Sequence, residues 1–211
     1  MRKLDIIELH CQFLEDYGFE FDPTKMIFFK NFPHGQQVVF IHFTEYPEGN
    51  ILEYILGVRI HQVEELIHKF LPTLSNYSEK SITLTQTPDK IGKQIPSHFI
   101  LENDGQLADA IMAAEKFFVL DGFAWMDKMI QPENLEKAFA DRKERTFRSQ
   151  NFVYTAFRGA TLAKLYNPED YPVLRNVYLG QIKQREMTPF TIASFLQLLD
   201  YLDKIEFRTA S

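Results

Sequence analysis

Residues 37–46, QVVFIHFTEY, and residues 50–60, NILEYILGVRI, decide the fold. In the second run the even-numbered residues from Leu52 to Ile60 are apolar, while Glu53 and Arg59 fall on the alternate face. A period of two is typical of a β-strand with one buried side. The segment Pro47-Glu48-Gly49 between the runs has the composition of a turn. Together they predict two antiparallel strands joined by a short connection.

Further strands are expected on either side of this pair. The run 26–32 (MIFFKNF) precedes it, and the runs 81–87 (SITLTQT) and 98–101 (HFIL) follow it. Apolar residues at helical spacing predict a helix over residues 4–17 that ends at Gly18, and another over residues 62–71 that ends at Pro72.

From Asn103 onward the apolar residues recur at helical spacing. We expect about five helices, including one that begins at Thr188-Pro189 with an N-cap and a proline in the first turn. The chain is therefore predicted to be α+β: a small, mainly antiparallel sheet of about four strands with packed helices, followed by a helical C-terminal half. The expected lobes are residues 1–101 and 102–211, packed as one unit.

The composition limits which cellular compartment and which classes of binding partner are expected for this chain. The formal net charge is −6, which disfavours general binding to nucleic acids, and the aromatic content of 14% is expected to fill the core. The single cysteine, Cys11, rules out an intrachain disulfide, and its place on an apolar helix face favours a structural role over a reactive one. With neither a signal peptide nor an apolar run of membrane-spanning length in view, we expect a cytoplasmic protein.

Familiar signatures of catalysis and cofactor binding are missing from the sequence. It contains no glycine-rich phosphate loop, no nucleophile elbow and no aspartate-rich calcium loop. No cofactor is expected, although a site assembled from distant residues stays open.

The closest approach to a metal-binding pattern lies in the predicted helix 62–71 and the histidine before it. His61 and Glu65 are four residues apart, as are Glu64 and His68, so His61, Glu65 and His68 are candidate ligands. Pairs at this spacing are more often neighbours on a solvated helix face, and that interpretation is favoured.

Four residues are candidates for a pocket between the sheet and the helical half. His42 lies in a strand and titrates near neutral pH, although no nucleophile lies beside it in the sequence. The other three candidates are Tyr54, Arg59 and Trp125.

Charged residues cluster in two places. A basic segment interleaved with acids suggests either a nucleic-acid face or, as the favoured interpretation, a solvated helix end with local ion pairs; its cations are Lys137, Arg142, Lys143, Arg145 and Arg148. Acidic residues near the strand turn and the end of the first helix suggest either a rim that attracts a cationic partner or simple solubility; they are Glu45, Glu48, Glu53, Asp16, Glu20 and Asp22.

The first third of the chain shows a resemblance. A helix that ends in Tyr17-Gly18-Phe19 is followed by phenylalanine-rich strands, with Gln36-Gln37-Val38 leading one and Leu56-Gly57-Val58-Arg59 inside the next. This order resembles uncharacterised bacterial domain-of-unknown-function proteins, some of which lie in toxin-immunity neighbourhoods. The resemblance implies an intracellular bacterial protein and assigns no functional residue.

These observations favour a non-enzymatic protein-binding or regulatory module, including one of the immunity type, that acts on a cationic partner. The alternative is an enzyme or small-molecule binder whose pocket contains His42, Tyr54, Arg59 and Trp125. A broad exposed surface would support the first hypothesis, and a pocket that gathers a histidine with carboxylates would support the second.

Overall fold

The computed structural model describes residues 3–71, 77–92, 95–141, 152–185 and 187–205. The chain forms two compact units. Unit 1 contains residues 1–60 and 82–130, and unit 2 contains residues 61–81 and 131–211. Each unit has its own hydrophobic core.

Unit 1 is built on a six-stranded antiparallel sheet. Strands β1 to β5 pair in sequence order, and β6 pairs with β4 beyond the end of β5. Their bounds are β1 Glu20–Asp22, β2 Ile27–Phe32, β3 Gly35–Tyr46, β4 Gly49–Ile60, β5 Leu84–Gln86 and β6 His98–Leu101. A 3₁₀ turn, η1 (Pro88–Lys90), follows β5.

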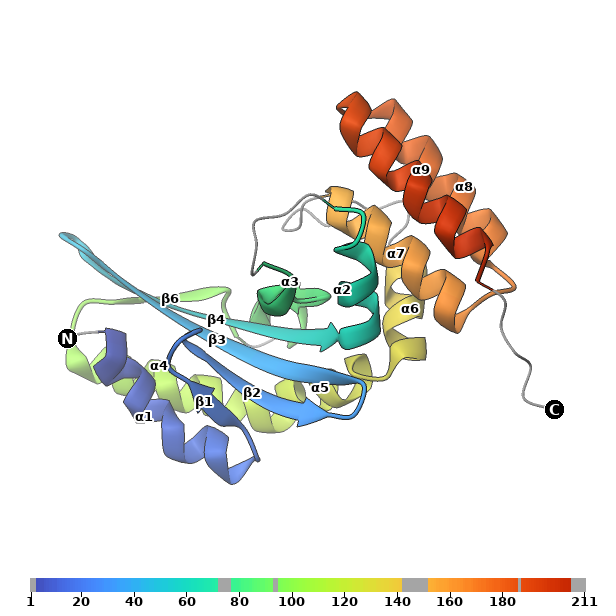
Figure 1. The fold of residues 1–211 in the computed structure, drawn as a ribbon. Helices are drawn as coiled ribbons and strands as arrows, with labels where there is room; N and C mark the ends of the chain where they lie inside the picture. The colour runs from blue at the N-terminus through green and yellow to red at the C-terminus, as the bar shows by residue number, and fades with distance from the viewer. Residues whose placement is uncertain (1–2, 72–76, 93–94, 142–151, 186, 206–211) are drawn as a thin grey trace. The chain divides into compact units, whose positions relative to one another are not determined.

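The hairpin of β3 and β4 is the centre of the sheet, as residues 37–60 predict. Its register runs from Gly35 opposite Ile60 to Tyr46 opposite Gly49, so the pairing continues to the last residue of each strand. Gly49 has a φ of +142°, a conformation that residues with a Cβ rarely adopt, and this lets the chain reverse there. Figure 1 shows the hairpin extending to the far end of the sheet.

Helix α1 (Lys3–Asp16) precedes the sheet and ends as its sequence predicts. Gly18 has a φ of +81°, its amide donates to the Glu15 carbonyl, and the Phe19 amide donates to the Leu14 carbonyl. This is the Schellman arrangement, which satisfies carbonyls at the end of a helix.

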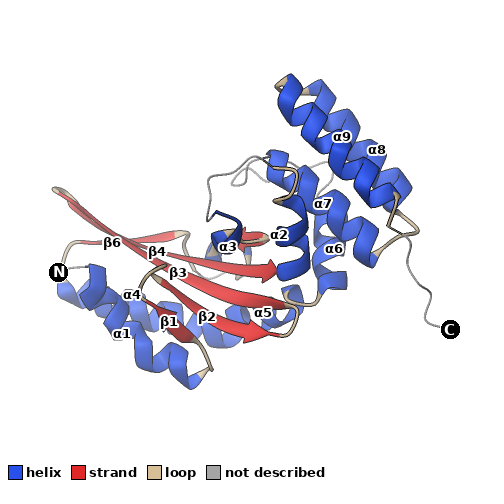
Figure 2. Ribbon diagram, in the orientation of Figure 1, coloured by secondary structure: helices blue, strands red, loops and turns tan. Residues whose placement is uncertain are grey.

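The second half of unit 1 is one nearly continuous helical run. Helix α4 (Asp104–Phe117) begins at Asn103, whose side chain accepts from the Gln106 amide, and it passes through a π-helical turn, η2 (Phe118–Gly122), into α5 (Phe123–Met129). Gly122 lies so close to the sheet that a Cβ there would meet Leu56 Cδ2 at 3.3 Å. Helices α1, α4 and α5 lie on one side of the sheet (Figure 2), and the core of unit 1 fills the space between.

Unit 2 is all helical in the residues that the structure describes. Helix α7 lies at its centre and contacts α2, α6, α8 and α9. The bounds are α2 His61–Ile67, α3 Tyr77–Lys80, α6 Pro132–Asp141, α7 Phe152–Tyr166, α8 Tyr171–Gln184 and α9 Pro189–Asp203. Thr188 caps α9 and Pro189 opens it, as predicted.

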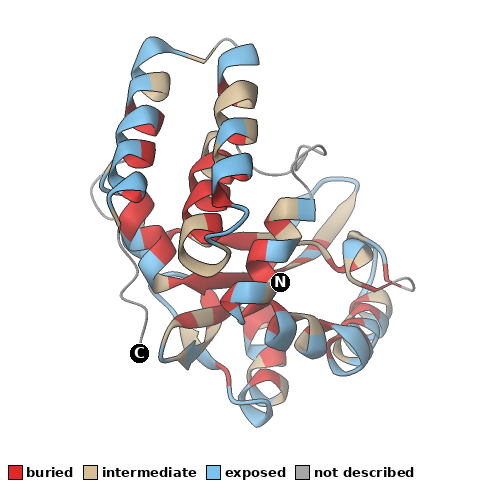
Figure 3. Cartoon of the chain, turned by 90° about the vertical axis from the view of Figure 1, so that its right-hand side faces the viewer, coloured by how far each residue is buried: buried red, intermediate tan, exposed pale blue. Residues whose placement is uncertain are grey.

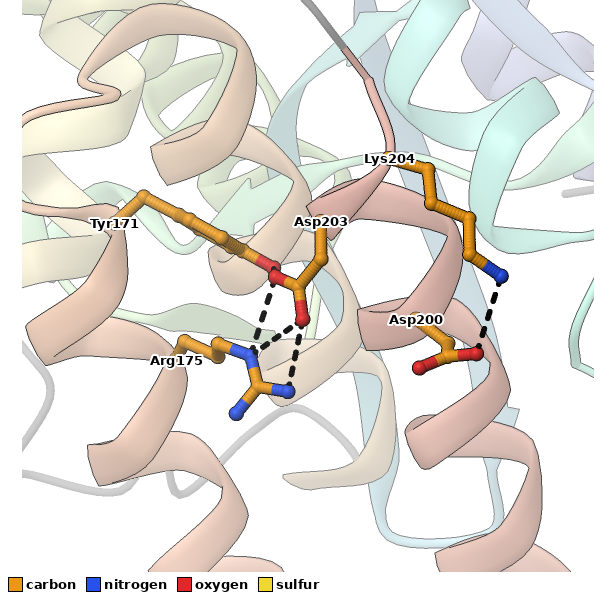
Figure 4. Close-up of polar contacts among 5 residues, drawn as sticks. All are labelled: Tyr171, Arg175, Asp200, Asp203 and Lys204. Atoms are coloured by element: carbon orange, nitrogen blue, oxygen red, sulfur yellow. Dashed lines mark hydrogen bonds and ion pairs between the residues drawn. The ribbon is translucent and has the colours of Figure 1, made fainter.

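A polar clamp joins the last two helices (Figure 4). Arg175 in α8 donates to the Asp203 carboxylate at 2.9–3.3 Å, and the Tyr171 hydroxyl donates to the same group at 2.8 Å. Lys204 pairs with Asp200 at 3.4 Å along α9. The clamp fixes how α8 and α9 pack, and we assign it a structural role.

The predicted α+β class and the helical C-terminal half are confirmed, but three details differ. The sheet has six strands where about four were expected. Strand β6 is the short strand expected at residues 98–101, whereas β1, only three residues long and held by its pairing with β2, was not expected. Leu9, one of the apolar residues within the predicted helix 4–17, is 52% exposed. The compact units also divide the chain differently from the expected boundary at residue 101, because α4 and α5 pack on the sheet whereas α2 packs on α7.

Buried residues follow the inward sides of the helices, while exposed residues lie on their outer sides (Figure 3). None of the helices that the structure describes is both long enough and apolar enough to span a membrane.

Candidate functional site

The two faces of the sheet differ sharply in burial. On the face that α1, α4 and α5 cover, Leu52, Tyr54 and Leu56 of β4 are at most 1% exposed. On the opposite face, Ile51 and Ile55 are partly exposed and Glu53 is exposed. A sheet with one solvated face normally carries polar side chains there. Here that face carries large aromatic and branched aliphatic side chains among its polar ones.

We call this surface the open face. Its residues are Phe40, His42, Thr44 and Tyr46 of β3, Ile51, Glu53 and Ile55 of β4, and His98 and Ile100 of β6. Strand pairing arranges most of them in rows across the sheet, with Ile51 between Thr44 and Ile100. Tyr46 and Ile100 are 54% and 64% exposed.

The open face becomes buried towards the other end of β4. Val38 and Gly57 are opposite each other, and both are buried. A Cβ on Gly57 would meet Ile82 Cγ2 at 2.8 Å, so Ile82 lies over the sheet there. The exposed part is therefore the end of the sheet that contains the hairpin turn and β6.

His42, the first predicted catalytic candidate, lies on the open face. Its ring stacks on Phe40 with the centroids 6.0 Å apart and the planes inclined by 8°. Glu53 is opposite His42 on one side and opposite His98 on the other, which gives a row of three titratable groups. Even so, the described residues contain no cluster of three or more His, Cys, Asp or Glu arranged to hold a metal ion.

Tyr54, the second candidate, lies on the covered face and is hydrogen-bonded to a buried histidine. Its hydroxyl lies 2.7 Å from Nε2 of His10, and Nδ1 of His10 lies 2.7 Å from the carbonyl oxygen of Ile6. A carbonyl can only accept, so we assign the proton to Nδ1, and Tyr54 donates to Nε2. Burial lowers the pKa of His10 and raises the pKa of Tyr54, so both are held neutral inside the core.

Arg59 and Trp125 occupy other places in unit 1. Arg59 is buried near the end of β4, on the strand side opposite that of Tyr54. Trp125 is partly buried in α5 and packs against the core. His42 and Tyr54 lie on opposite faces of the sheet, so these four residues do not form one site within unit 1.

The metal-ligand candidates lie in unit 2, next to a glutamate, Glu64, whose side chain is buried. Glu65 is exposed on α2, and His61 and His68 are partly exposed. Glu64 is fully buried. His68 Nε2 lies 3.7 Å from a Glu64 oxygen.

Glu64 belongs to a buried ion pair. Arg158 in α7 donates from Nε and Nη2 to the two Glu64 oxygens at 2.7 and 2.9 Å. The Arg158 guanidinium also lies over the Tyr154 ring, 5.0 Å from its centroid. Although burial acts to raise the pKa of Glu64, Arg158 and hydrogen bonds from His68 and Ser81 outweigh it and hold that pKa well below its usual value. The pair thus fastens α2 to α7.

A groove in unit 1 runs beside the π-helical turn and has a volume of about 640 Å³. Its walls are mainly apolar, and Lys116 and Asp121 are its charged residues. A second hollow of about 410 Å³ shares Lys116 and Leu120 with it and is also lined by Glu115 and Phe13. Among the residues that the structure describes, neither hollow is lined by a histidine, cysteine, serine or tyrosine.

The predicted charged clusters are only partly described. Of the basic segment, Lys137 is exposed on α6, and Arg142, Lys143, Arg145 and Arg148 lie outside the described residues. The predicted acidic residues are all exposed except Asp22, which is partly exposed. Burial, together with Glu15 and Glu8, raises the pKa of the Cys11 thiol, which agrees with a structural role for that residue.

Comparison of the chain with known protein families, curated proteins and solved structures found no match.

Two buried polar residues were missed from the sequence, His10 and Arg158. His10 lies among apolar residues of α1, one turn after Ile6, so its place on the buried side of the helix was available as a signal. Arg158 is 94 residues from Glu64 in the sequence, and no local pattern connects them.

Proposed function

We propose that this protein is a non-enzymatic protein-binding module that uses the open face of its sheet. The observation that carries the proposal is the exposure of large apolar side chains on a sheet face that no helix of unit 1 covers among the described residues. Contiguous exposed apolar surface marks interaction sites in soluble proteins, and aromatic residues are enriched in protein interfaces. A regulatory role, including neutralisation of a partner, is consistent with such a surface.

The geometry of the face supports a protein partner better than a small ligand. Small-molecule sites are concave and enclose most of their ligand. The residues of the open face follow three adjacent strands, and the most exposed of them, Tyr46 and Ile100, project from the surface. A surface that extends across three strands suits a second macromolecule.

The test is affinity capture from the lysate of the protein's own host, followed by identification of the retained proteins. Wild type is compared with a Tyr46→Asp, Ile100→Asp double variant. Both side chains are more than half exposed, so the change leaves the core intact. The control is Val173→Asp, Leu196→Asp in unit 2, where both residues are also exposed.

We expect wild type and the control to retain the same protein and the open-face variant to lose it. Retention by all three variants would place the interaction elsewhere. Capture of no protein at all would contradict the proposal.

A small-molecule binder is the second candidate, and the groove of about 640 Å³ beside the π-helical turn favours it. Turns of this kind occur often at functional sites. Native mass spectrometry of the purified protein would show a bound metabolite as an added mass. Its loss in an Ala113→Trp variant, which fills the groove, would support this second function.

A further inference from the structure

The open face lies in a part of the chain that carries no permanent positive charge. Residues 31–58 and 95–115 contain neither lysine nor arginine, although the whole chain has 23 of them. These two ranges contain β3, all of β4 before Arg59, and β6. The charged side chains beside the open face that come from these strands are therefore carboxylates.

Three exposed carboxylates lie on these strands or directly next to them. Glu53 lies within the face, in the row between His42 and His98. Glu48 is exposed in the turn that follows Tyr46, and Glu102 is exposed directly after the last residue of β6. Negatively charged residues therefore lie on the open face, at Glu53, and directly beside its strands in the sequence, at Glu48 and Glu102.

The described lysines of unit 1 lie in other segments and several have local partners. Lys25 pairs with Asp22 at 3.5 Å, Lys90 pairs with Asp89 at 2.7 Å, and the Lys30 ammonium donates to the Tyr17 carbonyl. Lys116 lies on α4, which packs on the covered face. Arg59 lies on the same side of β4 as the open face, but in the part of the strand that is buried. The exposed part of the open face therefore receives carboxylates and no lysine or arginine from β3, β4 or β6.

We propose that the open face docks a basic protein, whose lysine or arginine side chains pair with Glu48, Glu53 and Glu102 while an apolar side chain packs against Tyr46, Ile51 and Ile100. This inference rests on the proposed function and specifies the chemistry of the partner. An apolar centre with a charged rim is the usual anatomy of a protein interface. Carboxylates at the rim speed the approach of a cationic partner and make its binding sensitive to salt.

The probe is a pair of short labelled peptides, one alternating lysine with leucine and one alternating glutamate with leucine. Binding is followed by fluorescence anisotropy at low salt and at about 0.15 M salt. The variant is Glu48→Lys, Glu53→Lys. Its control is Glu8→Lys, Glu15→Lys, which changes the net charge equally but lies on exposed positions of α1, the helix that packs on the covered face.

We expect wild type to bind the lysine peptide at least about tenfold tighter than the glutamate peptide, and more weakly as salt rises. The open-face reversal should abolish that preference, and the α1 reversal should change the affinity by less than about threefold. Equal binding of the two peptides, or equal loss in both variants, would overturn the inference.

The protein captured from the lysate separates this inference from the proposed function. If Tyr46→Asp, Ile100→Asp loses that partner while Glu48→Lys, Glu53→Lys retains it, the open face binds a partner that is not basic. In that case the proposed function stands and the charge inference fails. Loss in both open-face variants, with retention in the α1 reversal, supports both.

Discussion

The buried ion pair of Glu64 and Arg158 is the residue-scale feature with the clearest energetic consequence. Both side chains are at most 5% exposed, and the two hydrogen bonds between them are short. Removing one partner of such a pair leaves a charge buried without compensation, which costs about 3–5 kcal/mol. We therefore expect Glu64→Gln to lower the free energy of unfolding by several kcal/mol, as measured by urea denaturation.

A double variant provides the control for this pair. Replacement of both partners by apolar residues, Glu64→Leu with Arg158→Leu, leaves no buried charge and should be less destabilising than either single change. If the single changes cost less than about 1 kcal/mol each, the pair does not fasten α2 to α7.

His10 gives the protein a predicted dependence of stability on pH. Burial lowers the pKa of His10 in the folded state below the ordinary value of 6.5. At pH values between these two pKa values, the unfolded chain therefore binds the proton more readily than the folded chain does. The stabilisation is fully present above that ordinary value and is lost as the pH falls through the lowered pKa. We expect the free energy of unfolding to fall between about pH 7.5 and about pH 5.5.

The matched variant is His10→Gln, which can still hydrogen-bond but cannot titrate. It should be less stable than wild type near neutral pH, with a shallower loss on acidification. Identical slopes for the two proteins would show that His10 is not the residue responsible.

At the scale of elements, the packing of α7 against α8 depends on a glycine. A Cβ on Gly159 would collide with the ring and hydroxyl of Tyr178, whose hydroxyl also donates to the Phe139 carbonyl at 3.3 Å. Gly180 in α8 has no atom within 4 Å of the same position. Gly159 and Gly180 both lie in helices, and they differ in the atoms that a Cβ at each position would meet.

We predict opposite effects for alanine at these two glycines. Gly180→Ala should raise the unfolding free energy by up to about 1 kcal/mol, because alanine favours the helix. Gly159→Ala should lower it by about 1–3 kcal/mol through overpacking, despite the same helix preference. Thermal denaturation of both variants is the measurement, and stabilisation by Gly159→Ala would contradict the packing described for Tyr178.

Local sequence patterns predicted the elements whose own residues are enough to indicate a strand or a helix end. Alternation in residues 50–60, the glycine at position 18 and the Thr188-Pro189 pair each specify a strand or a helix end without help from the rest of the fold. Strand β1 is too short for a periodic pattern and exists because β2 supplies its hydrogen bonds. The π-helical turn at Gly122 likewise depends on contact with the sheet.

At the scale of the whole molecule, the sequence predicted the class but not the candidate site. The alternation in β3 correctly placed His42 on the face opposite Ile41 and Phe43. It could not show which face the helices cover, because that depends on how α1, α4 and α5 pack. Tyr54 lies on the apolar side of residues 50–60 that the alternation predicts to be buried, but its hydrogen bond to the distant His10 has no local signal in the sequence.

Two places on the described surface of unit 1 are candidates for binding a partner, and we favour the open face. The open face combines apolar exposure with uniform negative charge, whereas the groove beside the π-helical turn contains both Lys116 and Asp121. Their positions within unit 1 allow a single mapping experiment to separate them.

The most direct test of the account is to map the amide chemical shifts of the isotope-labelled protein as it is titrated with the partner captured from the lysate. We expect the largest changes in chemical shift on residues 40–46 of β3, on residues 51–55 of β4 and on β6. Largest changes on α4 and the π-helical turn, with the open face unaffected, would contradict it.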